Sequence, residues 1–485
     1  MPQGEVTPAA GWAERLDEFA AGFFAAHRVP GGSLAVVTEG GTPFVRAYGW
    51  RDREARVPVA ADTVFGLASL TKSFTALTLL ALEARGVLTL DDPVERHLPA
   101  FAYPGVSRGS VRLVHLASHT SGLPPVRGLD FAIRPSQVGD PAQEFNRRDY
   151  RGAPDLGDHA ALLDYLAGEG RPALAAPGRV VSYSNDGYAL LGAVIEAATG
   201  EPYPDVVARE VLAPLGLTGA GFDTAAARAT GRLTELYTQA PTGEVVRSLQ
   251  WEEAPAYLAT GFLKASVLDL AAYLRYLLWP TPGTLAVPPG RLRELHVGRG
   301  WAERFTSYGL GWMLREGFHG RSLWRHGGSL KGVSSHLGAV PSLGLGVAVL
   351  ANLDEVPVKR LWHAAVNAYL GLPLEEPPFG GAHGHHAATA LGRAAPALAG
   401  VYDSGEPWGR LELVPDGERL LALVGELATP NGHLALLDEG EFVLVTEAGA
   451  WESGRFVYGV GRARPVALQY GMRWYDRRAE PGAAS

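Results

Sequence analysis

The sequence contains no cysteine and only four lysines among its 485 residues. The absence of cysteine excludes disulfide bonds, thiol nucleophiles and cysteine-ligated metals. Because arginine supplies most of the basic side chains, a lysine that lies beside a nucleophile has few competitors for a catalytic role. The four lysines are Lys72, Lys264, Lys331 and Lys359.

Charge of one sign is not concentrated anywhere in the chain. The net charge is −8 and there is no dense run of Lys and Arg, which argues against a nucleic-acid surface. No apolar stretch is long enough to span a bilayer, and Glu14, Asp17 and Glu18 interrupt the N-terminal segment where a signal peptide would have its apolar core. We therefore expect a cytoplasmic protein, although a secreted form trimmed before residue 1 would have the same pattern.

The chain is long enough to form two or more hydrophobic cores. Residues 373–396 are rich in Pro, Gly, His and Ala, which is typical of a linker. Beyond them short apolar runs alternate with turn signals, which predicts a small all-β sandwich or up-and-down barrel. We expect a catalytic domain at 1–372, a linker at 373–392 and an all-β domain at 393–478. Its predicted strands are 411–414, 420–424, 442–445, 456–460 and 466–470.

Helical and strand-like periodicities alternate within the first domain. A helix from about Ser69 to Gly86 is apolar on all sides, so it is expected in the interior. Residues 125–158 lack periodicity and predict a long irregular excursion. The other predicted helices are 11–28, 159–167, 186–198, 204–214, 267–278 and 357–370, and the strands are 33–37, 44–50, 321–325, 332–340 and 344–350.

Ser69 and Lys72 lie three residues apart at the start of the apolar helix. Residues at this spacing share one helix face, so the lysine amine can reach the serine oxygen. A serine hydroxyl needs such a base to act as a nucleophile, and a helix N-terminus favours developing negative charge. The pair is therefore a candidate nucleophile and base.

Two later motifs could complete a site. Tyr183-Ser184-Asn185 precedes a predicted helix: a tyrosine beside a cation has a lowered pKa and can accept a proton, and an asparagine amide can both donate and accept hydrogen bonds. His326-Gly327-Gly328-Ser329 leads into a strand, and its glycines allow a ligand backbone to approach closely. Alone, either motif also fits a turn, hairpin or bulge.

In this order, Ser-x-x-Lys, Tyr-x-Asn and His-x-Gly make the chain resemble the penicillin-recognising serine hydrolases. These include class C β-lactamases, D,D-peptidases, D-aminopeptidases and β-lactamase-like esterases. The resemblance covers residues 11 to about 372, and the tail is similar to a lipocalin-like module appended to some of these enzymes. Further matching segments are 116–124, 266–270, 308–312 and 350–352.

The resemblance implies a β-lactamase-like α/β (α+β) fold, with a central antiparallel sheet flanked by helices and an all-helical subdomain. Ser69 would attack a carbonyl and form an acyl-enzyme, while Lys72 and Tyr183 share the proton; which of the two is the general base stays open. The N–H groups of Ser69 and Ser329 would form the oxyanion hole with Gly328 beside them. Asn185 would hold the substrate amide, and His326 would line the strand-side wall.

The third motif departs from the family pattern. Penicillin-hydrolysing members carry Lys-Thr-Gly where this chain has His326-Gly327-Gly328, so the charge and hydroxyl that hold a substrate carboxylate are missing. We therefore expect a metal-independent hydrolase without a cofactor, acting on small esters or short peptides as a D-amino-acid peptidase or esterase. The alternatives are a β-lactamase or D,D-carboxypeptidase, and a slowly acylated penicillin-binding sensor. A homo-oligomer is compatible with the sequence.

Several histidines are weaker candidates. His115 and His119 are four residues apart, but no acidic third ligand accompanies them, which favours a structural role. His383, His385 and His386 lie in the Gly/Ala-rich linker and are expected to be solvated. No metal site is predicted.

Overall fold

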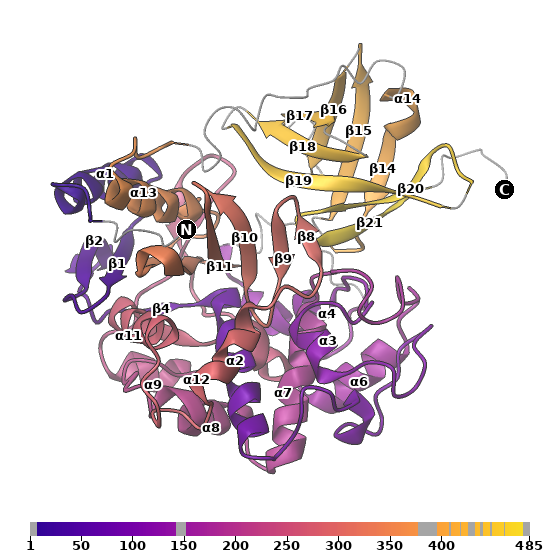
Figure 1. Ribbon diagram of the computed structural model, residues 1–485, viewed down its shortest axis with the longest axis horizontal. Helices are drawn as coiled ribbons and strands as arrows, with labels where there is room; N and C mark the ends of the chain where they lie inside the picture. The colour runs from indigo at the N-terminus through magenta and orange to yellow at the C-terminus, as the bar shows by residue number, and fades with distance from the viewer. Residues whose placement is uncertain are drawn as a thin grey trace.

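The structure is a computed structural model. It describes residues 7–141, 152–376, 395–406, 409–417, 419–424, 432–436, 440–446, 449–459 and 461–478. A large sheet with flanking helices, a helical region beneath it and a separate barrel are visible in Figure 1. Among the described residues, no helix has the length and apolar character that crossing a bilayer requires.

Nine strands form one antiparallel sheet in the order β3-β2-β1-β13-β12-β11-β10-β9-β8. Strands β1, β12 and β13 are buried along nearly their whole lengths, as expected for central strands covered on both faces. The strands are β1 (Gly31–Thr38), β2 (Phe44–Asp52), β3 (Val57–Pro58), β8 (Trp301–Glu303), β9 (Thr306–Tyr308), β10 (Met313–Phe318), β11 (Arg321–Leu330), β12 (Val333–Val340) and β13 (Leu345–Ala351).

Alternate residues of β1 belong to different cores. Leu34 and Val36 pack with α1 (Trp12–Ala26) and α13 (Val358–Leu370), whereas Ala35 and Val37 pack on the side of α11 (Val267–Leu278). Successive strand residues point to opposite faces, so helices cover both faces of the sheet.

The helical region surrounds α2 (Thr71–Ala84), which is buried at every residue from Thr71 to Leu82. This confirms the prediction of an interior helix. The other helices of this region are α3 (Leu113–Ala117), α4 (Gly128–Ile133), α6 (His159–Ala167), α7 (Asn185–Thr199), α8 (Tyr203–Val207), α9 (Thr224–Ala229), α10 (Leu258–Gly261) and α12 (Pro289–Leu292). Two short strands, β4 (Val64–Gly66) and β7 (Lys264–Ser266), pair with each other.

The C-terminal strands form a closed barrel in sequential order, the up-and-down form of the two predicted alternatives. The barrel packs around its own apolar core. The predicted linker at 373–392 lies largely outside the described residues, so the domain limits stay a prediction. The strands are β14 (Gly400–Asp403), β15 (Arg410–Asp416), β16 (Arg419–Val424), β17 (Gly432–Leu436), β18 (Glu441–Thr446), β19 (Gly449–Tyr458), β20 (Pro465–Tyr470) and β21 (Arg473–Arg477).

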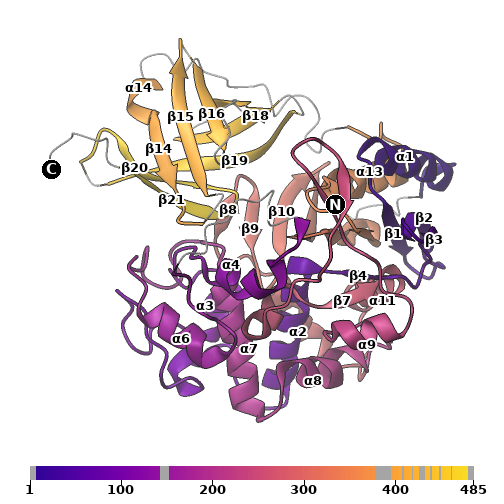
Figure 2. The same cartoon turned by 180° about the vertical axis from the view of Figure 1, so that it is seen from behind.

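The barrel lies against the β8–β9 end of the sheet, as Figure 2 shows from behind. Gln469 of β20 donates a hydrogen bond to the Val181 carbonyl at 2.6 Å, and Arg171 forms an ion pair with Asp476 of β21 at 2.7 Å. The turn between β20 and β21 is thereby held beside the segment that carries Tyr183.

Candidate active site

Ser69 lies in η1, a short 3-10 helix (Ala68–Leu70) directly before α2. The preceding residue, Ala68, has φ 47°, a left-handed conformation that is uncommon for a residue other than glycine. Lys72 Nζ donates a hydrogen bond to Ser69 Oγ at 3.1 Å. The predicted contact along the helix is therefore present.

Lys72 is fully buried, and its three acceptors are uncharged. Besides Ser69, they are Asn185 Oδ1 at 3.0 Å and the Thr260 carbonyl oxygen at 2.8 Å. Burial lowers the pKa of Lys72 well below its usual value; Arg473 lowers it further, and Asp186 opposes the shift. The geometry therefore supplies an amine that can be neutral beside a hydroxyl group.

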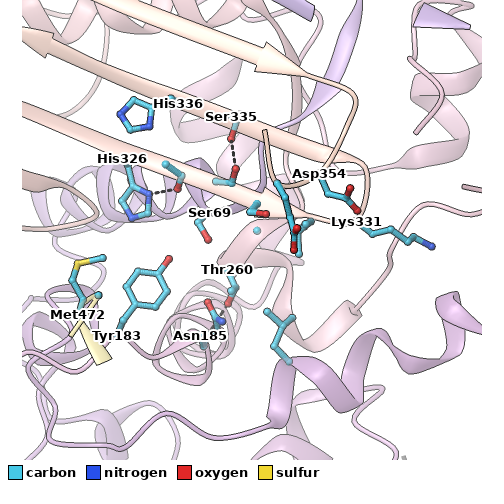
Figure 3. A pocket seen from close by; sticks show the side chains of 18 of the residues that line it. Ser69, Tyr183, Asn185, Thr260, His326, Lys331, Ser335, His336, Asp354 and Met472 are labelled. Atoms are coloured by element: carbon cyan, nitrogen blue, oxygen red, sulfur yellow. Dashed lines mark hydrogen bonds between the residues drawn. The ribbon is translucent and has the colours of Figure 1, made fainter. Parts of the chain in front are cut away.

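The Tyr183 phenol points toward Ser69 (Figure 3). Lys72 Nζ lies 4.9 Å from the centroid of the Tyr183 ring. Burial nevertheless raises the pKa of Tyr183 to about 12, although the hydrogen bond with Ser69 and the charge of Arg473 both lower it. The sequence predicts a lowered pKa, and the shift is in the opposite direction because desolvation outweighs the nearby cations. At neutral pH this group is a phenol.

Local sequence explains why Asn185 lies beside Lys72. Ser184 is the N-cap of α7, and its hydroxyl accepts a hydrogen bond from the Gly187 N–H at 3.0 Å, a common role for serine. This cap fixes the first turn of α7, which begins with Asn185. Thr260 Oγ1 donates to the Asn185 carbonyl at 2.9 Å and links α10 to the same turn.

The His-Gly-Gly-Ser motif forms the end of β11, next to η1. A Cβ on Gly328 would lie 2.4 Å from Ser335 Oγ and 2.5 Å from the Leu67 carbonyl oxygen, and Ser335 Oγ itself donates to that carbonyl at 2.7 Å. Only glycine allows β11 to lie this close to the residues that precede Ser69.

His326 is neutral and fixed in one tautomer. Burial lowers its pKa to about 3, with the charge of Lys72 as the next cause. Nδ1 lies 2.6 Å from the Gly327 carbonyl oxygen and must donate to it, so Nε2 accepts from the Tyr308 hydroxyl at 2.9 Å. This imidazole provides no positive charge to a substrate.

A cavity of about 700 Å³ joins these elements. Lys72 does not line it and instead lies behind its wall, in contact with Ser69. One wall carries apolar side chains of the 125–158 excursion, Val126, Leu129 and Ile133. The predicted site residues that line the cavity are Ser69, Tyr183, Asn185, His326, Gly328 and Ser329.

Sequence reasoning missed the contribution of the barrel. Met472 and Arg473 line the cavity, and the Tyr183 N–H donates to the Met472 carbonyl at 2.8 Å. The Arg473 guanidinium lies 4.9 Å from the centroid of the Tyr183 ring and forms an ion pair with Glu406 at 2.5 Å. No sequence signal indicates that residues nearly 300 positions apart would meet.

His119 also has a closer relation to the site than the sequence suggests. Its ring lies 4.2 Å from the Tyr183 ring between centroids, and its Nδ1 accepts from the Ser184 N–H at 3.2 Å. Burial holds the pKa of His119 well below its usual range. It therefore acts as a neutral support behind Tyr183.

The other candidate groups are not part of the Ser69–Lys72–Tyr183 cluster, although Lys331 lines the same cavity. Lys331 forms a buried ion pair with Asp140 at 3.0 Å, and Lys264 donates to the Phe222 carbonyl at 2.8 Å. A Gly-x-Ser-x-Gly pattern around Ser107 is an exposed turn rather than a strand-to-helix elbow. Within the described ranges no cluster of three metal-ligating side chains occurs, and His383, His385 and His386 lie outside them.

Comparison with known proteins gives one family. A family model described as Beta-lactamase matches residues 16–370. Esterase EstB of Burkholderia gladioli is 39% identical over 222 residues, which are 45% of this chain and 53% of that protein. Over the first curated relatives, the matched part spans 36% to 61% of their own length.

Two solved structures are similar over almost the whole chain, barrel included. The octameric penicillin-binding protein homologue from Pyrococcus abyssi superposes with a TM-score of 0.67 and 25% identity, covering 95% of this chain and 99% of that one. SurE, solved with D-Leu, gives a TM-score of 0.65 and 25% identity, covering 97% and 100%.

Proposed function

The chain belongs to the beta-lactamase family, the penicillin-recognising serine hydrolases, and from this premise we propose that Ser69, Lys72 and Tyr183 catalyse acyl transfer from small esters or amides to water. The observation that carries the proposal is the 3.1 Å contact between the Ser69 hydroxyl and a buried amine. Among the described residues, the hydrogen-bond acceptors of this amine are all uncharged.

The directions of the two pKa shifts divide the roles. Lys72, whose pKa is lowered, accepts the Ser69 proton as Oγ bonds to the substrate carbonyl carbon. Tyr183, protonated at neutral pH, passes a proton to the leaving group as the carbonyl bond to that group breaks. Water then attacks the acyl-enzyme, its proton returns through the same groups, and Ser69 is released.

The N–H groups of Ser69 and Ser329 are the proposed oxyanion donors. Their elements are held together by the close approach of Gly328 to the Leu67 carbonyl. In comparable enzymes, removing one such donor costs about 3 kcal/mol of transition-state stabilisation. Asn185 is proposed to orient the substrate amide.

For the substrate, we infer an ester or a D-amino-acid amide without a carboxylate next to the scissile bond. His326 is neutral, and of the five cavity-lining cations, Arg127, Arg325, Lys331 and Arg473 each face a carboxylate within 3.3 Å, which weakens their attraction for a substrate anion; the fifth is Lys359. The apolar wall at 126–133 suits an apolar acyl group. The esterase relative and the D-Leu complex of SurE support these two substrate classes.

A substrate panel tests the proposal. It comprises p-nitrophenyl butyrate, the p-nitroanilides of D- and L-leucine and a chromogenic cephalosporin, each with wild-type protein and Ser69→Ala. We expect turnover of the ester, the D-anilide or both, and loss of that activity in Ser69→Ala. Efficient cephalosporin hydrolysis without the other activities would assign a β-lactamase instead, and a stable adduct without turnover would assign a sensor.

Assembly is a separate proposal. The octameric state named for the Pyrococcus abyssi homologue motivates a homo-oligomer here. Light scattering after size-exclusion chromatography tests this, and a monomer across micromolar concentrations would contradict it.

A further inference from the structure

A buried carboxyl group follows Asn185 in the first turn of α7. Asp186 is 2% exposed, and its Oδ1 accepts a hydrogen bond from the Tyr257 hydroxyl at 2.6 Å. Tyr257 is itself fully buried. A buried carboxylate whose neighbour is a neutral phenol is costly, so its presence beside the proposed catalytic group requires an explanation.

The contact with Tyr257 connects the two elements that hold Lys72. Tyr257 ends η5, a 3-10 turn (Pro255–Tyr257) that leads directly into α10. Asn185 at the start of α7 and Thr260 in α10 supply two of the three acceptors of the Lys72 amine. The Asp186–Tyr257 hydrogen bond therefore fixes the spacing between those acceptors.

The start of α4 packs onto the same pair. A Cβ on Gly128 would lie 2.1 Å from Tyr257 Oη and 2.2 Å from Asp186 Oδ1. The next residues, Leu129 and Asp130, line the cavity. One carboxyl group thus connects the amine of the proposed base to a wall of the substrate cavity.

We propose that Asp186 is a positioning residue for Lys72, holding α7 against the η5–α10 segment and supplying the buried negative charge that stabilises the Lys72 ammonium. The inference rests on the proposed role of Lys72. In the step concerned, the Ser69 proton moves to Lys72 Nζ while Oγ bonds to the electrophile, and Asp186 keeps its own protonation state. The buried anion favours the charged amine through space.

The surroundings set the sign of the expected effect. Burial raises the pKa of Asp186 to about 7, although the hydrogen bond from Tyr257 lowers it. The cation Arg473 lowers the pKa of Lys72, whereas Asp186 raises it. Other titratable groups interact with Asp186, namely Tyr103, Tyr165, Glu169 and Glu406. Those that interact with Lys72 are His119, Tyr183, Tyr188 and His326.

Asp186→Asn tests the inference because the amide keeps the oxygen that accepts from Tyr257 and removes only the charge. The readout is the rate of covalent labelling of Ser69 by a fluorophosphonate across pH, followed by intact mass, which needs no natural substrate. Wild-type labelling is expected to rise as Lys72 loses its proton. In Asp186→Asn the midpoint moves to lower pH by about one unit, a tenfold change in the proton equilibrium.

Two further variants keep the test decisive. Asp205→Asn removes an exposed acid on α8 and is expected to leave the midpoint unchanged. Tyr257→Phe keeps the carboxyl group but removes the hydrogen bond that favours its ionised form, so it too moves the midpoint to lower pH and replaces Asp186→Asn if that variant does not fold. A folded variant with the wild-type midpoint, or one slowed equally at every pH, overturns the inference. Labelling of Ser69 without turnover of any ester or amide counts against the proposed function alone.

Discussion

Replacing Gly328 with alanine tests whether the approach of β11 to η1 builds the oxyanion hole. The added Cβ would lie 2.4 Å from Ser335 Oγ, 2.5 Å from the Leu67 carbonyl oxygen and 3.0 Å from Ala68 Cβ. Because two of these atoms belong to the backbone or Cβ of the segment before Ser69, a rotamer change cannot relieve the clash. The strand must move by about 1 Å to reach ordinary contact distances of about 3.5 Å.

The expected loss is large for a single methyl group. A displacement of about 1 Å in a catalytic group costs on the order of 100-fold in rate, and removing an oxyanion donor costs 100- to 1,000-fold, or about 3–4 kcal/mol. We expect kcat/KM for p-nitrophenyl butyrate to fall at least 100-fold in Gly328→Ala. The fall should lie mainly in kcat, because the donors act on the transition state.

Gly327→Ala is the matched control on the same strand. Its added Cβ would face His336 Nδ1 at 3.3 Å and no atom of η1, so we expect a loss of less than tenfold. Thermal unfolding monitored by circular dichroism checks that both variants fold. If folded Gly328→Ala retains kcat within threefold of wild type, the proposed role of this contact in the oxyanion hole is refuted.

Three other predictions concern buried charges. Arg473→Met removes a cation that lowers the pKa of Lys72, so the acidic limb of the kcat/KM profile should move to higher pH; an unmoved limb would contradict this. Lys331→Met removes the buried cation that pairs with Asp140 and should lower the free energy of unfolding by about 3–5 kcal/mol in urea titrations, whereas a loss below 1 kcal/mol would show that the ion pair contributes little. Folding raises the pKa of Asp186 from 3.8 to about 7, so the folded protein holds a proton that the unfolded chain releases between these pH values. The free energy of unfolding of the wild type should therefore decline by about 4 kcal/mol as pH rises from 4 to 8, and Asp186→Asn should lack this decline. Parallel curves of unfolding free energy against pH for the two proteins would contradict this.

The elements of the first domain were predictable where local patterns are strong. The apolar α2, the amphipathic α1 and α11, and the central strands of the sheet follow from periodicity. The short strand β8 at the edge of the sheet and its neighbour β9 were not predicted, because three residues carry no usable period. Within 125–158 the sequence predicts an irregular excursion, but α4 forms there, packed through Gly128 onto Tyr257 and Asp186. This packing is a tertiary effect that no local pattern shows.

The site was predictable as far as its motifs extend. Ser69, Lys72 and Asn185 come together as their spacing and the family resemblance imply. The direction of the Tyr183 pKa was not predictable, because it depends on burial rather than on sequence neighbours. Arg473 was missed because the docking of the barrel brings it to Tyr183.

Quenched-flow mass spectrometry during p-nitrophenyl butyrate hydrolysis shows whether Ser69 forms an acyl-enzyme. We expect a transient butyryl group on the peptide that contains Ser69, formed within the first turnover and lost once the ester is consumed. Ser69→Ala is expected to show neither the adduct nor hydrolysis. Hydrolysis that continues in Ser69→Ala, or an acyl group found on another residue, would contradict it.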